Sequence, residues 1–159
     1  MTRDKILEHA MQCFFAAMRA GWAAGAETLP GGMPGFVQIP FRKWDFQVLD
    51  RYCISDAGSA GETTIWFGIK PVWHMSYGGH YPETVVKFLK QALLLNYATD
   101  CFEGGRGPSH LRERHRSGMT YMNKVVRGSS FESFRGAEFI FYADGKFAGD
   151  HEYFGGALI

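Results

Sequence analysis

The chain has 159 residues, of which 46% are hydrophobic and 21% charged, and its formal net charge is +1. This length and composition predict one globular domain over residues 1–159 and exclude a disordered or fibrous chain. The near-neutral charge argues against a general role in binding nucleic acids or membrane surfaces, since both attract proteins with a sustained positive field. No apolar stretch approaches the roughly 20 residues needed to cross a bilayer.

Cysteine usage and the first residues predict the cellular location. Cys13, Cys53 and Cys101 lie far apart, without a C-x-x-C pair. An odd number of cysteines fits a reducing cytoplasm better than a disulfide framework. The charged residues 3–5 fit a helix start rather than the apolar region of a signal peptide. We therefore expect a cytoplasmic protein.

The first predicted element is an amphipathic helix over residues 3–24, because apolar side chains recur there at intervals of three and four. This stripe comprises Leu7, Met11, Phe14, Met18 and Trp22. The segment 29–35 is rich in Pro and Gly, which neither a helix nor a central strand tolerates, and is expected to form a loop.

Residues 44–54 show the alternation of a half-buried strand. Its apolar face comprises Trp44, Phe46, Val48, Tyr52 and Ile54. A turn rich in Gly and Ser then leads to a strand over 62–68, and a turn around Pro71 leads to another over 72–77.

A second helix is predicted to begin at Pro82, whose missing N–H is tolerated in a first turn. Residues 100–117 are expected to form a long polar loop, followed by a strand over 119–127 and a hairpin over 138–153. This order of elements predicts an α+β fold: an antiparallel sheet of about six strands, with the N-terminal and central helices packed on one face.

The predicted hairpin places a carboxylate beside an imidazole. Asp144-Gly145 is a strong signal for a two-residue turn, because both residues tolerate positive φ. Such a turn gives the opposed pairs Tyr142–Phe147, Ile140–Gly149 and Glu138–His151, whose members share a face. Glu138 and His151 are therefore candidate catalytic residues for acid–base chemistry. The alternative is a cross-strand ion pair without chemistry, and a slip of one residue would separate the two side chains.

Aromatic and polar residues from several loops and strand ends predict a ligand pocket. We expect its walls to be Trp66, Trp73, Tyr77 and Tyr142, and its polar contacts to be His74, Arg106, Glu138 and His151. The glycine-flanked Arg106 either binds an anionic group, with the glycines as an anion nest, or stacks on a neighbouring aromatic ring. The two tryptophans are either pocket walls or core.

Other chemistries have weaker signals. His74, His80, His110 and His115 lack the tight spacing of a zinc site, so no metal or other cofactor is predicted. Ser76 and Cys101 are not part of a recognisable nucleophile motif. Basic residues between 106 and 127 favour a solvated face over a nucleic-acid site, because the whole chain is near neutral.

Several segments together resemble a family of small bacterial proteins known only as a domain of unknown function. They are G-E-x-x-x-W at 61–66, P-V-W-x-M-x-Y at 71–77, R-G-P at 106–108 and the ending Phe154-Gly155-Gly156. The resemblance covers nearly the whole chain, and His74 and Ser76 depart from the family pattern. It implies no reaction. Some members of the family that this chain resembles are fused to helix-turn-helix domains, and in those proteins the resembling domain is expected to have a sensing or interaction role.

Three hypotheses for the function follow. The first is a cytoplasmic sensor or binding domain for a small molecule, with the aromatic-walled pocket described above. The second is a small enzyme, hydrolytic in the simplest case, that uses Glu138 and His151 for proton transfer. The third is an interaction protein that forms a homodimer through exposed aromatic residues.

Overall fold

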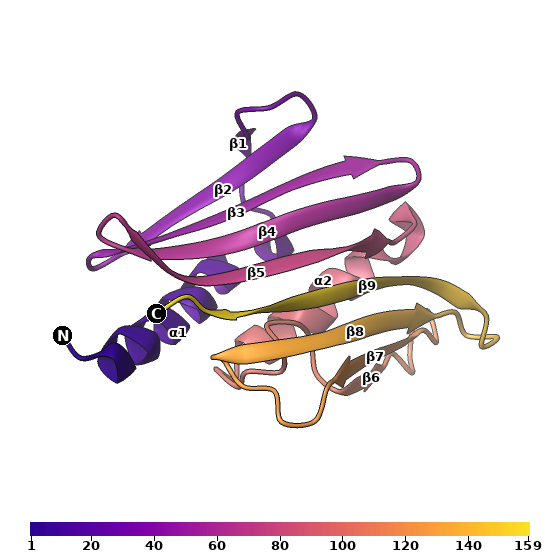
Figure 1. Ribbon diagram of the computed structural model, residues 1–159. Coiled ribbons are helices and arrows are strands. Elements are labelled where there is room, and N and C mark those ends of the chain that lie inside the picture. Colours follow the sequence, from indigo (N-terminus) through magenta and orange to yellow (C-terminus); the bar gives the residue numbers. More distant parts are fainter.

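The computed structural model describes residues 1–159. All strands form a single antiparallel sheet in the order β1-β2-β3-β4-β5-β9-β8-β7-β6 (Figure 1). The helical elements are α1 (Arg3–Ala20), the 3-10 helix η1 (Trp22–Ala24) and α2 (Glu83–Tyr97). The strands are β1 (Leu29–Pro30), β2 (Phe36–Lys43), β3 (Phe46–Ser55), β4 (Gly58–Phe67), β5 (Lys70–His80), β6 (His110–Arg112), β7 (Thr120–Val125), β8 (Ser133–Phe141) and β9 (Phe147–Ala157).

The prediction of about six strands was wrong, because the sheet has nine. The three additional strands, β1, β2 and β6, lie toward its two edges. β1 pairs only with Val37 and Gln38, so the rest of β2 forms an edge, where Pro40 is tolerated despite its missing N–H. β6 has three residues within the predicted polar loop and becomes a strand only by pairing with β7. Short or proline-containing edge strands carry little periodic signal in the sequence.

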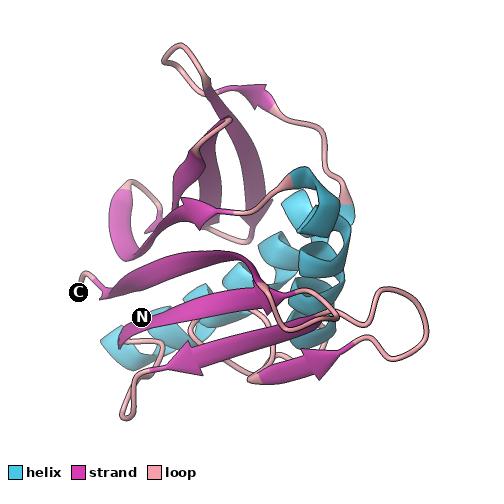
Figure 2. Cartoon of the chain, turned by 90° about the vertical axis from the view of Figure 1, so that its right-hand side faces the viewer, coloured by secondary structure: helices cyan, strands magenta, loops and turns pink.

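Both helices lie on the same side of the curved sheet (Figure 2). α1 ends at Ala20 rather than residue 24, and the chain continues through Gly21 into η1. Leu7, Phe14 and Met18 of the predicted stripe are buried, whereas Met11 and Trp22 are partly buried. The buried face of α2 comprises Val85, Phe88, Leu89, Ala92, Leu93, Asn96 and Tyr97. The core therefore fills the space between the helices and the concave face of the sheet.

Strand β3 differs at its ends from the predicted strand over 44–54. Phe46, Val48 and Tyr52 are buried as expected. Trp44 instead occupies the β2–β3 turn with a φ of 55° and is 59% exposed. Ile54 is 64% exposed near the far end of the strand. Alternation of residue type therefore located the strand, but the turn and the extent of the helices determine which of its apolar residues are buried.

The hairpin formed by β8 and β9 reaches the predicted register by a different route. Glu138 pairs with His151 and Ile140 with Gly149, as predicted, but Phe147 pairs with Phe141 rather than with Tyr142. The Tyr142 N–H donates to the carbonyl of Lys146, so the loop is longer than the expected two residues. An irregularity next to Phe141 restores the register. The longer loop and the irregularity each shift the register by one residue, and the two shifts cancel before the chain reaches Glu138.

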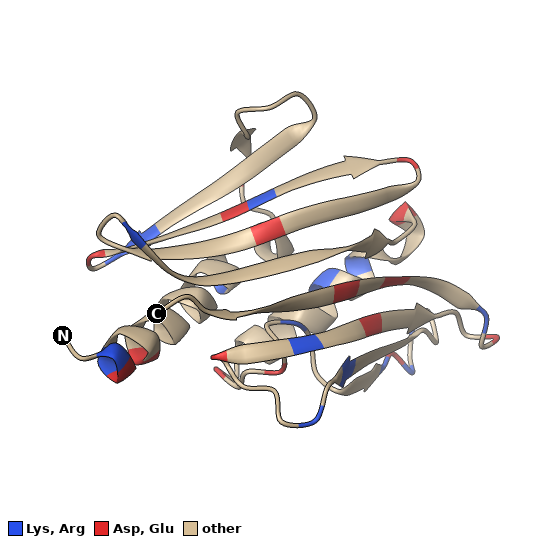
Figure 3. Ribbon diagram, in the orientation of Figure 1, with Lys and Arg blue, Asp and Glu red and all other residues tan.

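Charged residues of both signs are interspersed over the sheet and helices (Figure 3). Within the basic segment 106–127, Arg106 is buried, while the other basic side chains are exposed. Neither helix combines the length and the apolar composition that a membrane-crossing helix requires.

Candidate functional site

A cavity of about 70 Å³ lies between the helices and the concave face of the sheet. Its apolar and aromatic lining comes from both layers and includes Met18, Trp22, Tyr52, Met75, Tyr77, Leu93 and Tyr97. Five polar side chains also line it, namely Asp50, Ser59, Thr63, Arg106 and His151. A concave, mostly apolar site with a few convergent polar groups is typical of small-molecule binding.

Asp50 is one of the residues of this site that the sequence did not single out. It lies on β3 with the same alternation as Phe46, Val48 and Tyr52, so its side chain points toward the core. A carboxylate within a buried apolar face was the signal that could have identified it. On the neighbouring strand it pairs with Thr63, which is fully buried.

The Asp50 carboxylate is held by two neutral donors. The Tyr77 hydroxyl donates to Asp50 Oδ1 at 2.6 Å, and the Thr63 hydroxyl donates to the same oxygen at 3.1 Å. Burial raises the pKa of Asp50, although these hydrogen bonds and the nearby charge of Arg106 act in the opposite direction. Asp50 has no ion-pair partner in the chain.

Tyr77 reaches Asp50 because the residue beside it on β4 has no side chain. Tyr77 pairs with Gly61, and a Cβ at Gly61 would lie 2.5 Å from the Tyr77 hydroxyl oxygen. The phenol ring therefore lies across the glycine toward β3. Burial and the neighbouring Asp50 raise the pKa of Tyr77 well above its usual value, so the hydroxyl remains a donor.

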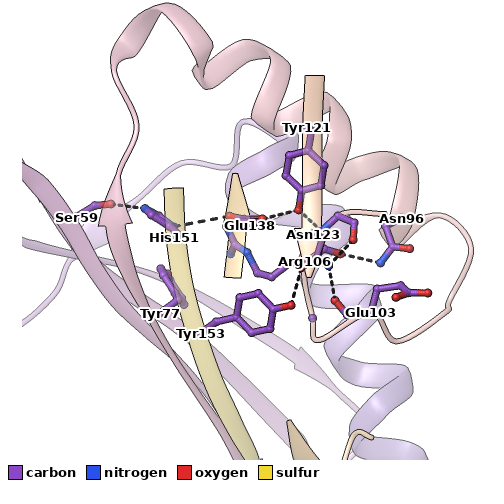
Figure 4. Close-up of polar contacts among 12 residues, drawn as sticks. Ser59, Tyr77, Asn96, Glu103, Arg106, Tyr121, Asn123, Glu138, His151 and Tyr153 are labelled. Atoms are coloured by element: carbon purple, nitrogen blue, oxygen red, sulfur yellow. Dashed lines mark hydrogen bonds and ion pairs between the residues drawn. The ribbon is translucent and has the colours of Figure 1, made fainter. Parts of the chain in front are cut away.

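Arg106 and Glu138 form a buried ion pair beside the cavity (Figure 4). Arg106 Nη2 lies 2.5 Å from Glu138 Oε1, and the two residues are 6% and 0% exposed. The Tyr121 hydroxyl donates to the other oxygen of Glu138 at 2.5 Å. Burial by itself lowers the pKa of Arg106, but the adjacent Glu138 raises it by more, so the guanidinium remains charged. The charge of Arg106 is thus neutralised within the chain.

The loop that carries Arg106 is fixed by side chains from α2. The Asn96 amide donates to the Arg106 carbonyl at 2.7 Å, and the Tyr97 hydroxyl donates to the Gly105 carbonyl at 3.2 Å. The guanidinium lies 5.4 Å from the centre of the Tyr77 ring. Of the two alternatives for Arg106, the geometry favours packing on an aromatic ring over an open anion nest.

His151 lies beside Glu138 but is bonded to another residue. Its Nε2 shares a hydrogen bond with Ser59 Oγ at 2.8 Å, whereas its Nδ1 is 3.9 Å from Glu138 Oε1 and has no partner. Burial lowers the pKa of His151 to about 4, and the charge of Arg106 acts in the same direction. The imidazole is therefore neutral at pH 7. Ser59 was not singled out in the sequence, and it reaches His151 past Gly79, the residue between them on β5.

The remaining predicted pocket residues do not line the cavity. Trp73 is fully buried in the core, where its indole N–H donates to the carbonyl of Phe131 at 2.7 Å. Trp66 and His74 alternate with buried residues and lie on the outer face, where His74 Nε2 is bonded to Ser76. Tyr142 is half-buried beside the start of α2. No group of three or more His, Cys, Asp or Glu side chains is placed to hold a metal ion.

A family model described as a domain of unknown function, DUF5680, matches residues 52–158, which is more than half of the chain. The chain belongs to the DUF5680 family. The DUF5680 match includes Ser59, Arg106, Glu138 and His151, while Asp50 lies just before it. No curated protein and no solved structure matches the chain. Family membership assigns no ligand or reaction to the chain.

Proposed function

We propose that this chain is a cytoplasmic binding or sensor domain for a small molecule, which it holds in the cavity between the helices and the sheet. The observation that carries the proposal is Asp50, a carboxylate on the cavity wall that forms no ion pair within the chain. A buried charge that is unpaired is costly for folding. A ligand that contacts it would offset this cost, which is a physical reason to keep the residue there.

Binding fits the site better than acid–base catalysis by Glu138 and His151. Both oxygens of Glu138 are already bonded, one to Arg106 and one to Tyr121. His151, with a pKa of about 4, is a weak base at neutral pH. General bases work best when their pKa is near the operating pH.

A sensing role also fits the position of the cavity. Trp22 of η1 and Leu93 and Tyr97 of α2 line it, so an occupant would contact both helical segments and the sheet. Bound ligand would therefore stabilise the packing of these layers against each other. Such coupling suits the fusions to bacterial helix-turn-helix regulators that the family resemblance implies.

A thermal-shift screen tests the binding function. The compounds are metabolites and simple organic ions of positive, negative and zero charge. A ligand at 100 times its Kd stabilises a protein by about 2.7 kcal/mol, which corresponds to a rise in Tm of about 5–10 °C for a chain of this length.

Two matched variants locate the binding. Ala23 lines the cavity, whereas Ala24 on the same turn is exposed. Ala23→Phe fills the cavity and is expected to abolish the shift, and Ala24→Phe is expected to retain it. The proposal is overturned if no compound raises the Tm, or if Ala23→Phe responds as the parent does.

One observation favours a second candidate, a hydrolase. Ser59, His151 and Glu138 lie in a row, and the 2.8 Å contact between Ser59 Oγ and His151 Nε2 resembles that of a nucleophile with its base. A fluorophosphonate probe followed by mass spectrometry tests this candidate. Labelling of Ser59 that is lost in His151→Gln would support hydrolysis, and no labelling is expected if the domain only binds.

A further inference from the structure

We infer that the cavity selects an organic cation, a primary or secondary ammonium with an apolar body, whose nitrogen binds Asp50 and whose body lies among the aromatic side chains. The inference rests on the proposed function, since it names the class of ligand that the same cavity takes. It follows from the balance of charges, the free acceptor on Asp50 and the aromatic walls.

The charges around the cavity do not cancel. Arg106 is neutralised by Glu138 at 2.5 Å, and His151 is uncharged at neutral pH. This leaves Asp50, which is bonded only to the neutral hydroxyls of Tyr77 and Thr63. The cavity therefore has one carboxylate that forms no ion pair, because Arg106, whose charge also acts on Asp50 from a greater distance, is paired with Glu138. A cationic ligand would supply the missing charge, and an anionic ligand would add a second negative charge.

Asp50 also has an acceptor to offer. Both of its hydrogen bonds end on Oδ1, so Oδ2 has no donor within the chain. A primary or secondary ammonium would donate an N–H to this oxygen, and such charge-assisted hydrogen bonds are about twice as strong as neutral ones. Arg106 is less available to an anion, because its Nη2 is bonded to Glu138. Its Nε has no partner in the chain, but this atom is buried and so is not accessible to a ligand.

The walls suit the rest of an organic amine. Tyr52, Tyr97 and Trp22 line the cavity together with aliphatic side chains. Aromatic faces attract cations, and they exclude water from an ion pair with Asp50. Tyr77 already packs against the Arg106 guanidinium at 5.4 Å, so this site accommodates a cation beside an aromatic ring.

The size of the cavity limits how much of a bound ligand can be buried. Its volume of about 70 Å³ is about half that of an engineered apolar cavity that binds benzene. The ammonium and the first carbons would fill it, and a longer body would extend past Ile54, a lining residue that is 64% exposed. The fitting ligand is therefore a monoamine with a slender head rather than a bulky or polycationic compound.

Matched ligand series test the inference by calorimetry. The aromatic series is phenethylamine, phenethyl alcohol and phenylacetate, and the aliphatic series is isoamylamine, isoamyl alcohol and isovalerate. In at least one series we expect the amine to bind about tenfold or more tightly than the alcohol, with the carboxylate weakest. Asp50→Asn should reduce the ratio of amine to alcohol to about one while preserving binding of the alcohol, and the exposed Asp45→Asn should leave the ratio unchanged.

The outcomes separate this inference from the proposed function. Equal or tighter binding of the alcohol or carboxylate, or a ratio that survives Asp50→Asn, overturns the selection of cations. A different outcome is that neither amine binds, while other compounds bind to the parent chain and fail to bind to Ala23→Phe. In that case the selection of cations is wrong and the binding function stands. If no compound of any charge binds, both fail. If Asp50→Asn does not fold, the ratio measured with the unaltered chain still decides.

Discussion

Arg106 and Glu138 are 32 residues apart in the chain and form a buried ion pair with a 2.5 Å contact. The pair joins the loop after α2 to strand β8. The pair also affects the neighbouring His151. Because the Glu138 carboxylate is bonded to the Arg106 guanidinium, it does not hold a proton on the imidazole. The cavity is consequently lined by an arginine paired with Glu138, a neutral histidine and an aspartate without an ion-pair partner.

The ion pair predicts strong coupling in a double-mutant cycle. Arg106→Met and Glu138→Met should each lower the free energy of unfolding by about 3–5 kcal/mol, because each leaves a buried charge without its partner. The double variant should lose much less than the sum. Urea unfolding measures all three values.

The exposed pair Arg51–Glu62 serves as the control for this cycle, since its contact is of similar length but its side chains are 38% and 39% exposed. Glu62→Gln should cost no more than about 1 kcal/mol. Additive losses for the buried pair would show that Arg106 and Glu138 contribute independently.

His151 predicts a loss of stability in mild acid. Its pKa lies near 4 in the folded chain, below its ordinary value of 6.5, because burial and Arg106 disfavour the charged form. Between these values the unfolded chain binds the extra proton, so the free energy of unfolding falls as the pH drops from about 6.5 to about 4. The loss attributable to His151 is roughly 3 kcal/mol.

His151→Gln should remove this part of the pH dependence, as measured by denaturant unfolding at pH 7 and at about pH 4. His110→Gln alters an exposed histidine and should retain the full acid sensitivity. An unchanged pH profile in His151→Gln would contradict the assignment of a buried neutral imidazole.

Asp50 predicts a gain of stability on substitution. Its pKa is raised in the folded chain, chiefly by burial. As the pH rises, Asp50 therefore loses its proton in the unfolded chain before it does so in the folded chain. The free energy of unfolding is consequently lower at neutral pH than in acid. Asp50→Asn removes that penalty and still offers Tyr77 an acceptor. We expect a rise in Tm of about 2–4 °C at pH 7, equivalent to ~1 kcal/mol.

The difference should vanish below about pH 3, where Asp50 is protonated in both states. Calorimetry at the two pH values checks this prediction. Of the titratable groups around Asp50, Tyr52, Tyr77 and Arg106 keep their charge in that range, whereas His151, which lines the same cavity, becomes protonated near pH 4. The parent chain and Asp50→Asn both contain His151, so its own titration affects both Tm values. A lower Tm for Asp50→Asn at pH 7 would instead show that the carboxylate stabilises the empty cavity.

Gly61 predicts that a single methyl group disrupts the site. A Cβ there would lie 2.5 Å from the Tyr77 hydroxyl oxygen and 2.7 Å from the Tyr52 Cβ, which cannot move away without the backbone. Gly61→Ala should cost about 1–3 kcal/mol, as overpacked cores do, and should weaken ligand binding. Ala60→Val, on the exposed side of the same strand, is the control for both measurements. Equal Tm values for Gly61→Ala and the parent would refute the close packing of Tyr77 on β4.

The β8–β9 hairpin shows which part of the site the sequence could predict. The alternation of residue types and Asp144-Gly145 correctly predicted that Glu138 opposes His151, although the loop is longer and an irregularity compensates for it. Tyr77, Arg106 and His151 were also predicted and line one cavity. The sequence left open which partner Glu138 takes, because Arg106 comes from a loop whose path no local pattern determines.

The sequence by itself determined the positions of the two long helices and of the six strands with clear alternation, because these depend on residue periodicity. It also predicted the pairing of Glu138 with His151, which holds because the longer loop and the irregularity next to Phe141 compensate each other. Only the tertiary structure decided that Trp73 is core, that β1, β2 and β6 extend the sheet, and that Asp50 and Ser59 face the cavity with Arg106. The physical reason is that burial, ion pairing and edge-strand pairing depend on contacts between segments far apart in the chain.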